Sequence, residues 1–416
     1  MRRTKESPVV LSYLKRYKDM DFFDNSNWFL TKSLLSLFGA WPFQSSRFLG
    51  IRRCAATFIL CSLLVPEMLR MSAVWGNMSM FAGCCSMLTL HMMTMVNLIN
   101  CFAFSETEKK LLMQIKAHRL AHVSDEESQL FQAHDGRSKK ITYGYVFYVT
   151  FTTVLYMIAP TIPRILDYIA PLNETRPAIY LYEAEYFVDR EEYNNWIMIH
   201  SILVTPVPAT IIVAFDLLYY HLVEHACNLF SIGSKRMSKL PNYLDQQTGQ
   251  EISANIDDTR DSFRKCIIQH VTALKFVGVL ETVYTKALFF ILGINMMSIS
   301  IAGLQAVSKL DDPKEAIRLG IYTIALLIHL YFLSWPGQQL IDHSEYIHTA
   351  AYQGCWYNTP LHSQKLVMLT MMRSLNPCKL TAGGFYIMSL PNFCAVKKTF
   401  FVQKLHCTSY CTLKSN

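Results

Sequence analysis

Long hydrophobic blocks separated by polar segments are the dominant pattern along this chain. A helix of about 20 apolar residues matches the hydrocarbon thickness of a bilayer, and six blocks are long and apolar enough to meet that length. They comprise residues 54–74, 80–104, 141–160, 196–223, 287–307 and 317–335. A seventh block, residues 385–411, is weaker because Lys397, Lys398 and Lys404 interrupt it. The pattern predicts an all-α membrane protein with seven transmembrane helices.

Three finer features refine these predicted helices. Residues 28–38 form an amphipathic stretch that ends before Gly39, which predicts a helix lying on the inner membrane surface. Pro206 and Pro208 remove backbone donors from the fourth block and predict a kink there. From Asp257 onward, apolar residues recur at helical spacing into the fifth block, so we expect this helix to project well into the cytoplasm.

Composition supports a membrane protein and excludes several other classes. Hydrophobic residues make up 51% of the 416 positions and charged residues only 17%, whereas soluble domains carry about a quarter charged residues. The net charge of +8 does not indicate nucleic-acid binding, because the basic residues flank hydrophobic segments. The 12 cysteines include no C-x-x-C pair and fall mostly in apolar blocks, which predicts free thiols.

The distribution of lysine and arginine predicts the orientation in the membrane, since basic residues favour the cytoplasmic side. The polar segments on one side hold 26 of these residues, and those on the other side hold 5. The basic side comprises residues 1–53, 105–140, 222–270 and 336–384, and the other side comprises residues 75–79, 161–195 and 308–316. We therefore expect a cytoplasmic N-terminus and, with seven spans, an extracellular C-terminus.

Two glycosylation acceptors agree with this orientation. Asn77 and Asn173 each begin an N-x-[ST] tripeptide, which is modified only on the lumenal or extracellular face. Both lie in segments that the charge distribution places outside. Asn77 is expected to lie close to the bilayer, so Asn173 is the better acceptor.

A cytoplasmic N-terminus with seven spans is opposite to the orientation of a G-protein-coupled receptor. The third block ends in Ile158-Ala159-Pro160 and not in an acidic-Arg-aromatic triplet, and Asn376-Pro377 is not followed by the tyrosine of the Asn-Pro-x-x-Tyr pattern. The predicted outer loops contain no cysteine for a bridge. Transporters built from inverted repeats are not indicated either, because neither half of the chain mirrors the other.

Catalytic and metal-binding motifs are also missing from the sequence. It contains no glycine-rich phosphate loop and no Ser/His/Asp set, so we expect neither an enzyme nor a cofactor. His118 with His122, and His221 with His225, have the i, i+4 spacing that holds a metal on a helix. Neither pair has a glutamate in the order of H-E-x-x-H, and we predict no metal site.

The most specific motif begins with the run AYQGCWY at residues 351–357 and continues through residues 365–369, 372–375 and 380–385. In this order the runs resemble the cytoplasmic approach to the last helix of insect odorant receptors. The early run LFGAWP at residues 37–42 is similar to the segment that precedes the first helix of that family. The resemblance covers nearly the whole chain, and the sequence as a whole is similar to receptors of bees, wasps and ants.

This resemblance implies an odorant-gated, non-selective cation channel subunit in the plasma membrane of olfactory neurons. It also implies a heterotetramer with a shared co-receptor and a small volatile ligand. The resemblance implies four domains. A cytoplasmic N-terminal segment with an interfacial helix covers 1–53, and helices one to six, with an odorant pocket in their outer half, cover 54–335. A cytoplasmic anchor segment at 336–384 joins the inner ends of helices four to seven, and a pore-lining seventh helix covers 385–416. The alternative is a metabotropic seven-helix chemoreceptor of the G-protein-coupled or gustatory type.

The lysines of the seventh block depart from the family pattern, whose last helix lines the pore and is largely apolar. Each lysine at the centre of a bilayer costs roughly 2.5 to 3.5 kcal/mol on an insertion scale. We therefore assign no gate residues from the resemblance. A misread exon junction before Thr408 is one hypothesis, and sequencing the transcript across codons 394–410 tests it.

An odorant site needs an apolar cavity with a few hydroxyl, sulfur or aromatic contacts. In the predicted orientation, the starts of helices two, four and six and the ends of helices three and five form the outer half. The candidate ligand-binding residues there are Met87, His91, Thr153, Tyr156, Met157, Met198, Ile202, Thr205 and Tyr322. Glu67 and Asp216 are ionisable groups at membrane depth, which makes them functional candidates by default. The competing interpretation of each residue is helix packing or, for the ionisable ones, pairing between helices.

Overall fold

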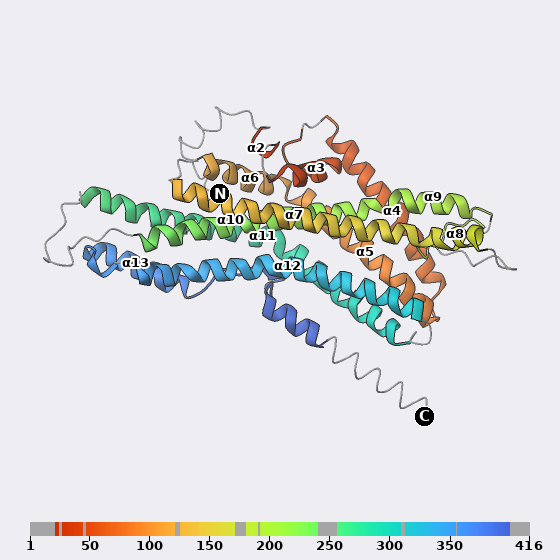
Figure 1. Ribbon diagram of the computed structural model, residues 1–416. Coiled ribbons are helices and arrows are strands. Elements are labelled where there is room, and N and C mark those ends of the chain that lie inside the picture. The colour runs from red at the N-terminus through yellow and green to blue at the C-terminus, as the bar shows by residue number, and fades with distance from the viewer. Residues whose placement is uncertain are drawn as a thin grey trace, which may run out of the picture.

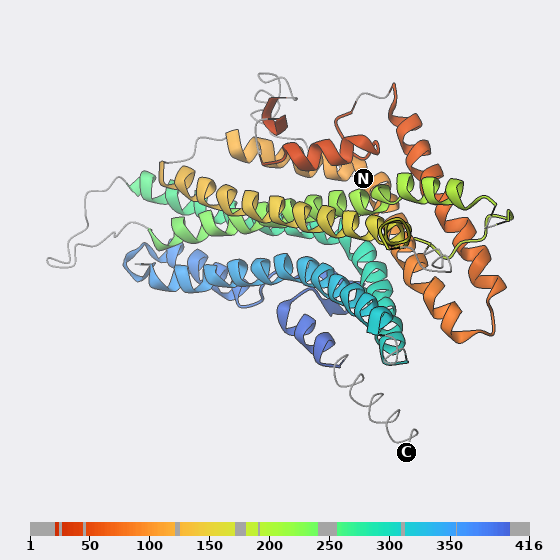
Figure 2. The same ribbon diagram turned by 45° about the vertical axis from the view of Figure 1, so that its right-hand side comes forward.

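The computed structural model of the protein consists almost entirely of long helices that lie side by side (Figures 1 and 2). It describes residues 21–24, 27–44, 47–120, 125–170, 180–189, 192–239, 256–308, 313–354 and 356–399. Its named helices are α2 (Asp21–Asp24), α3 (Phe29–Leu37), α4 (Leu49–Ala73), α5 (Met78–Ala103), α6 (Ser105–Leu120), α7 (Asp125–Ile158), η1 (Ala159–Thr161), α8 (Ile162–Ile169), α9 (Asn194–Val204), α10 (Pro206–Ser238), α11 (Ile256–Ser308), α12 (Pro313–Gln353), η2 (Trp356–Asn358) and α13 (Leu361–Ser374). A further helix covers residues 390–399, and strands β1 (Thr381–Ala382) and β2 (Tyr386–Ile387) form a short antiparallel hairpin.

Six segments of the described chain are long and apolar enough to cross a membrane. Each coincides with one of the six strong hydrophobic blocks, which confirms the helical membrane class predicted from the sequence. The segments are Leu49–Ala73, Met80–Ala103, Glu127–Ile158, Asn194–Ser238, Asp261–Ala306 and Arg318–Gln353.

The longest helices extend far beyond the thickness of a bilayer. α11 has 53 residues and α12 has 41. At 1.5 Å per residue these lengths are about 80 and 60 Å, whereas the hydrocarbon core is about 30 Å thick. The polar extension predicted for the fifth helix is therefore present, since α11 begins at Ile256.

Helix α10 lies at the centre of the bundle. It packs against α5, α7, α11 and α12, and every residue from Ile211 to Phe230 is buried. A helix that is buried on all sides belongs to the interior of a bundle. Its polar residues, among them Asp216 and Glu224, must therefore find partners on the neighbouring helices.

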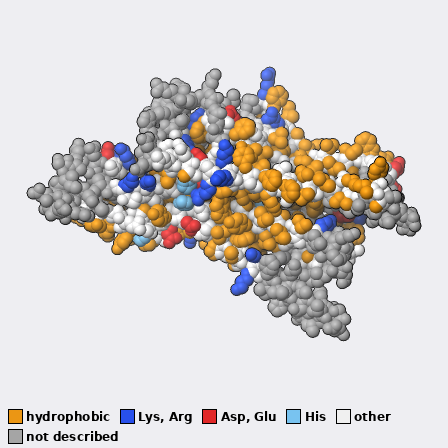
Figure 3. Space-filling view, in the orientation of Figure 1, with side chains coloured by type: hydrophobic (Ala, Val, Ile, Leu, Met, Phe, Trp, Pro, Cys, Tyr) orange, Lys and Arg blue, Asp and Glu red, His pale blue; other side chains and the backbone are white. Residues whose placement is uncertain are grey.

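Helix α7 shows where the apolar belt begins on the surface. Lys139 and Lys140 are exposed, and beyond them the exposed side chains of the same helix include Phe147, Phe151 and Leu155. Hydrophobic side chains cover this face of the bundle around and beyond the middle of α7, while Lys and Arg side chains gather toward its other end (Figure 3). An exposed apolar surface of this kind is typical of helices that face lipid.

The fourth hydrophobic block forms two helices. α9 ends at Val204 and α10 begins at Pro206, so the interruption falls where Pro206 and Pro208 predicted a kink. Proline at the first position of α10 is compatible with a helix start because its missing N–H needs no partner there. Both views show that the helices separate toward the end that carries α4, α8 and α9 (Figures 1 and 2).

The N-terminal part packs on α10 through aromatic side chains. α3 lies within the predicted amphipathic stretch and buries Thr31 and Leu35. The Trp28 ring lies 4.8 Å from that of His221, measured between centroids. Gly39 has a φ of 69°, and a Cβ atom there would lie 3.1 Å from the carbonyl oxygen of Leu49, so both its conformation and the space favour glycine. The predicted position of α3 at a membrane surface stays a prediction.

The segment before the predicted seventh helix is a hairpin docked on α11. The Thr381 N–H donates to Glu281 Oε2 at 2.9 Å, and the Gly383 N–H donates to the Thr285 carbonyl at 3.0 Å. Because the hairpin extends through β2, the helix begins at residue 390 and not at Phe385. Residues 400–411 of the predicted span lie outside the described residues, so a seventh span stays a prediction.

Candidate ligand-binding site

Tyr182 lies at the centre of a cluster formed by α4, α5, α7, α9 and the segment between α8 and α9. Leu181, Tyr182 and Ala184 of that segment are buried together with Leu63 and Val204. The half-buried side chains packed against them are Ile59, Met87, Tyr156, Tyr186 and Ile202. A connecting segment thus contributes to the interior where the helices separate.

Hydrogen bonds and ion pairs hold this segment against α4. The Glu185 N–H donates to the Pro66 carbonyl at 2.9 Å. Arg70 on the next turn of α4 lies 3.7 Å from the carboxylates of both Glu183 and Glu185. The Tyr186 hydroxyl lies 3.3 Å from Nδ1 of His200 on α9. The position of Tyr182 is therefore fixed from two sides.

Five of the nine predicted ligand-binding residues surround Tyr182. The Tyr156 hydroxyl donates to the Leu181 carbonyl and also lies 3.5 Å from Met87 Sδ. The Thr205 and Tyr182 hydroxyls are 2.7 Å apart. The His91 and Tyr182 ring centroids are separated by 5.4 Å. The fifth residue, Ile202, packs in the same cluster.

The other four predicted residues lie apart from this cluster. The Tyr322 hydroxyl on α12 donates to the Ser86 carbonyl on α5 at 2.6 Å. The Thr153 hydroxyl donates to the Val149 carbonyl of its own helix at 2.8 Å. Met198 is buried on α9, and Met157 is half-buried on α7. Met157, Met198 and Tyr322 are not among the apolar side chains packed in the hydrophobic cluster around Tyr182.

Glu67 and His91 form a buried polar pair beside Tyr182. His91 Nδ1 lies 2.8 Å from Glu67 Oε2, and neither residue is exposed. Within the described structure, Glu67 Oε1 and His91 Nε2 are buried without a hydrogen-bond partner. The structure thus places a polar pair with two unused atoms beside an otherwise apolar cluster.

The sequence analysis did not identify Tyr182, because it lies in a polar connection without helical periodicity. The aromatic residues Tyr180, Tyr182 and Tyr186 in that connection are the only sequence feature that sets it apart. Burial raises the pKa of the Tyr182 hydroxyl, the hydrogen bond with Thr205 lowers it less, and the nearby Glu67 carboxylate adds to the rise. The hydroxyl therefore stays neutral at physiological pH and can donate or accept.

Asp216 forms a second buried polar group in the middle of the bundle. The Tyr145 hydroxyl on α7 donates to Asp216 Oδ2 at 2.5 Å, and His329 Nε2 on α12 lies 3.2 Å from the same oxygen. His329 Nδ1 in turn lies 3.2 Å from Asn295 Nδ2 and 3.4 Å from its Oδ1 on α11. These contacts link four helices, and they agree with the interpretation of Asp216 as a pairing residue.

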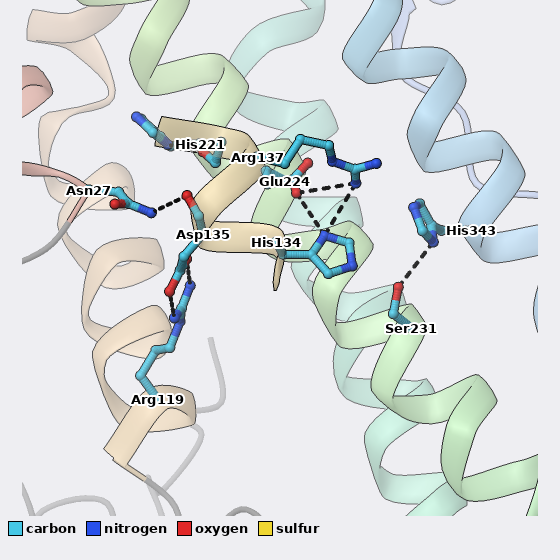
Figure 4. A network of polar contacts seen from close by, with 10 residues as sticks. Asn27, Arg119, His134, Asp135, Arg137, His221, Glu224, Ser231 and His343 are labelled. Atoms are coloured by element: carbon cyan, nitrogen blue, oxygen red, sulfur yellow. Dashed lines mark hydrogen bonds and ion pairs between the residues drawn. The ribbon is translucent and has the colours of Figure 1, made fainter. Parts of the chain in front are cut away.

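A histidine-rich network lies farther along α10, around Glu224, where α6 and α7 pack near it (Figure 4). His134 Nδ1 is 2.8 Å from Glu224 Oε1, and Arg119 donates two hydrogen bonds to Asp135 at 2.5 and 2.6 Å. The cavity beside it has a volume of about 20 Å³ and is lined by Asn27, Trp28, Ile115, Arg119, Asp135, Ser138, His221, Glu224, His225 and Asn228. That volume suits a single water molecule and is too small for an odorant.

His118 of the first histidine pair singled out in the sequence and His225 of the second lie in this network. His118 Nδ1 lies 3.1 Å from His225 Nε2, and burial lowers the pKa of His118. His122 lies outside the described residues. Among the residues that the structure covers, no three His, Cys, Asp or Glu side chains are placed to hold a metal ion.

The structure describes only one of the two predicted glycosylation acceptors. Asn77 is exposed and caps α5, where its side chain accepts a hydrogen bond from the Met80 N–H at 3.2 Å. Asn173 lies outside the described residues. Modification of either asparagine stays a prediction.

Sequence comparisons identify related proteins. Residues 70–401 match the family model described as 7tm Odorant receptor. Odorant receptor 67a of Drosophila melanogaster is 23% identical over 177 residues, which cover 40% of this chain and 43% of that protein. Odorant receptor Or2 of Anopheles gambiae is 24% identical over 131 residues, which cover 31% of this chain and 34% of that protein. The chain thus aligns with less than half the length of each of these relatives.

The fold also has a counterpart among solved structures. It is similar to the insect olfactory receptor OR5 from Machilis hrabei, solved in complex with eugenol, with a TM-score of 0.70 and 12% sequence identity over 98% of this chain and 99% of that one. A second structure of that receptor gives a TM-score of 0.64. At this identity the likeness shows the fold alone. The family match, however, extends over well more than half of the sequence, and it shows that this chain is a multi-pass membrane protein of the insect odorant receptor family.

Proposed function

We propose that the chain is the odorant-binding subunit of a ligand-gated cation channel. The cluster around Tyr182 is the observation that carries this proposal, because it combines apolar side chains with a few hydrogen-bonding groups where the helices separate. That composition suits a site for small, mainly apolar molecules. The solved receptor of Machilis hrabei was obtained with eugenol, which supports a small odorant as the ligand class.

The side chains of this site suit recognition of small molecules by shape. Met87 is unbranched and polarizable, so it can adapt to different ligands. Tyr156 and Tyr182 present rigid rings of large area with a hydroxyl at one end. Since both hydroxyls are already engaged, the rings are held in place before a ligand arrives. Met157, Met198, Thr153 and Tyr322 extend the proposed site along the neighbouring helices.

The proposed orientation places the N-terminus in the cytoplasm and the Tyr182 cluster in the extracellular half. Its support is the excess of lysine and arginine in the segments at the opposite end of the bundle. The proposal makes Asn173 and Asn77 extracellular. It assigns residues 336–384, with the polar ends of α10 and α11, to a cytoplasmic anchor, and residues 385–416 to the pore.

We also propose assembly with a shared co-receptor into a heterotetramer. α13 supports this proposal, because it leaves a row of large apolar side chains exposed in the proposed anchor. They are Leu361, Met368, Leu369, Met372 and Leu375, which are 67%, 47%, 60%, 63% and 62% exposed. Since no lipid reaches this part in the proposed orientation, a second subunit is the partner that would cover them.

Expression with and without a co-receptor tests the channel proposal. We expect odorant-evoked currents only when both chains are present, and we expect them to persist in excised patches without nucleotide. Currents that require GTP would instead favour the metabotropic alternative. Epitope tags at both ends test the orientation independently, and an extracellular N-terminal tag would contradict it.

A further inference from the structure

Glu67 and His91 are a buried polar pair at an otherwise mainly apolar candidate site. Both residues are fully buried between α4 and α5, and their pairing uses only one carboxylate oxygen and one ring nitrogen at 2.8 Å. Glu67 Oε1 and His91 Nε2 have no partner in the described part of the structure. A buried charged group with unused hydrogen-bonding capacity is destabilising, so it persists where something else supplies the missing contact.

The position of the pair relative to the cluster identifies what can supply that contact. The Tyr182 ring lies 5.4 Å from the His91 ring, and the backbone of Pro66, next to Glu67, holds the Tyr182 segment through the Glu185 N–H. Leu63, one turn before Glu67, belongs to the same apolar cluster. A ligand that occupies this cluster would therefore meet the pair with one end.

We propose, resting on the proposed odorant-binding function, that Glu67 and His91 select volatile alcohols and phenols by binding the ligand hydroxyl. A hydroxyl group donates one hydrogen bond and accepts others. It can donate to Glu67 Oε1, the unused carboxylate oxygen, while His91 Nδ1 keeps Oε2 engaged and holds the carboxylate in place. The apolar side chains around Tyr182 then hold the carbon skeleton.

Other ligand classes match this pair less well. Ethers, esters and ketones accept hydrogen bonds but donate none, so they leave Glu67 Oε1 unsatisfied in a buried site. A site that is built to bond a hydroxyl rejects an analogue without one, because its own buried groups then stay unpaired. A primary ammonium would have to bring its positive charge out of water into a buried, mainly apolar cluster, which is costly.

The protein contains a matched pair that serves as a control. His134 Nδ1 lies 2.8 Å from Glu224 Oε1, which is the same pairing at the same distance, and Glu224 is also buried. That pair lies beside the small cavity, 19 residues after Thr205 along the central helix and so about 28 Å away. Glu67→Gln and Glu224→Gln therefore make the same chemical change at the candidate site and far from it.

The experiment measures odorant-evoked currents from the full chain with a co-receptor. The probes are hexyl, octyl and phenyl skeletons, each supplied as the alcohol or phenol, as its methyl ether and as the primary amine. We expect the wild type to respond best to the hydroxyl compounds. In Glu67→Gln their half-maximal concentration should rise about ten-fold or more, the loss of one hydrogen bond to a charged group, while the response to ethers stays within about three-fold. Glu224→Gln should preserve the order of preference.

A double variant keeps the test decisive if Glu67→Gln does not reach the cell surface. Replacing both partners of a buried pair by apolar residues is often neutral or stabilising, so Glu67→Leu/His91→Leu should fold. We expect it to lose the preference for hydroxyl compounds and to respond to ethers at least as well as the wild type.

The outcomes separate this inference from the function on which it rests. Equal wild-type responses to alcohols and ethers, a preference for amines, or an unchanged preference in Glu67→Gln would overturn the inference and leave the odorant receptor function standing. Silence of the surface-expressed wild type toward these probes and toward a broad odorant panel would overturn both.

Discussion

The hydroxyl groups of Tyr182 and Thr205 lie 2.7 Å apart, so a residue from a connecting segment is tied to the break between α9 and α10. Thr205 also donates to the Ser201 carbonyl at 2.6 Å, which satisfies the end of α9. The segment that carries Tyr182 is therefore connected directly to the start of the central helix.

A double-mutant cycle should detect this connection. Tyr182→Phe and Thr205→Val each remove one hydroxyl of the pair, and we expect each to lower the free energy of unfolding by about 1 kcal/mol. The double variant should lose less than the sum, because the two residues share one hydrogen bond. Thermal unfolding in detergent measures the three values, and strict additivity would show that the pair is not formed.

Tyr156→Phe should alter odorant responses more than Tyr322→Phe. Tyr156 packs in the Tyr182 cluster and donates to the Leu181 carbonyl, whereas Tyr322 bonds to Ser86 outside that cluster. Losing a net hydrogen bond of about 1 kcal/mol should weaken the response about five-fold in the first variant. Dose–response curves at matched surface expression provide the measurement. Unchanged curves for both variants would remove both tyrosines from the site.

Stability should depend more on a hydrogen-bond acceptor at position 216 than on a negative charge there. Asp216→Asn retains a partner for the Tyr145 hydroxyl, and we expect a loss of about 1 to 2 kcal/mol. Asp216→Ala removes the acceptor of the Tyr145 hydroxyl and the carboxylate that lies 3.2 Å from His329 Nε2, and it should cost about 3 to 5 kcal/mol. Surface yield and thermal unfolding report the difference. Equal values would mean that the carboxylate does not hold these helices together.

Glu108 should make stability depend on pH. Burial raises the pKa of this α6 carboxyl from 4.5 to about 8, with a smaller opposing contribution from its hydrogen bond to Tyr284. Since the folded state then binds a proton that the unfolded state releases, stability is greatest below pH 4.5 for this group and falls as pH rises toward 8. The slope is at most about 1.4 kcal/mol for each pH unit.

Glu108→Gln isolates this effect, because it keeps a hydrogen-bonding side chain that cannot ionise. We expect the variant to be more stable than the wild type at pH 8 and to show a flatter dependence between pH 5 and pH 8. Thermal unfolding at a series of pH values makes the comparison. Parallel curves for the two proteins would contradict the buried, protonated state of Glu108.

The exposed row on α13 should be required for assembly. Leu369→Asp and Met372→Asp place a charge on surfaces that are 60% and 63% exposed, so the isolated subunit should fold normally. In the proposed heterotetramer the same charges would be buried without a partner, and co-purification with the co-receptor should fall at least ten-fold. Lys139→Glu, a charge change at an exposed position of α7 outside this row, should leave assembly intact.

The sequence was sufficient to locate the six spans, because blocks of about 20 apolar residues are rare outside membrane helices. It placed the helix ends less well, since polar turns such as those before Ile141 become helical through packing on neighbouring helices. The structure brings five residues predicted to bind ligand together around Tyr182, namely Met87, His91, Tyr156, Ile202 and Thr205, and their role in ligand binding stays a prediction. The sequence could not show that Thr153 bonds within its own helix, because that depends on a rotamer.

The least predictable part of the site is the segment that contains Tyr182. Connections carry no periodic pattern, and their path depends on contacts distant in sequence, here Arg70 with Glu183 and Glu185. Those ion pairs have no sequence signature. The same limit applies to the pairing of Glu67 with His91, because both residues are identifiable as unusual but only the packing of α4 on α5 brings them together.

The break at Thr205 gives α10 the properties of a lever. Its 33 residues extend about 50 Å from the candidate site and pass the histidine network near their middle, so a tilt of about 5° at Thr205 displaces the far end by about 4 Å. Because α10 is enclosed on all sides, it cannot tilt alone, and the surrounding helices must rotate with it. Binding of a small volatile molecule at one end of α10 would therefore cause a concerted rotation of several helices at its other end, not a local rearrangement.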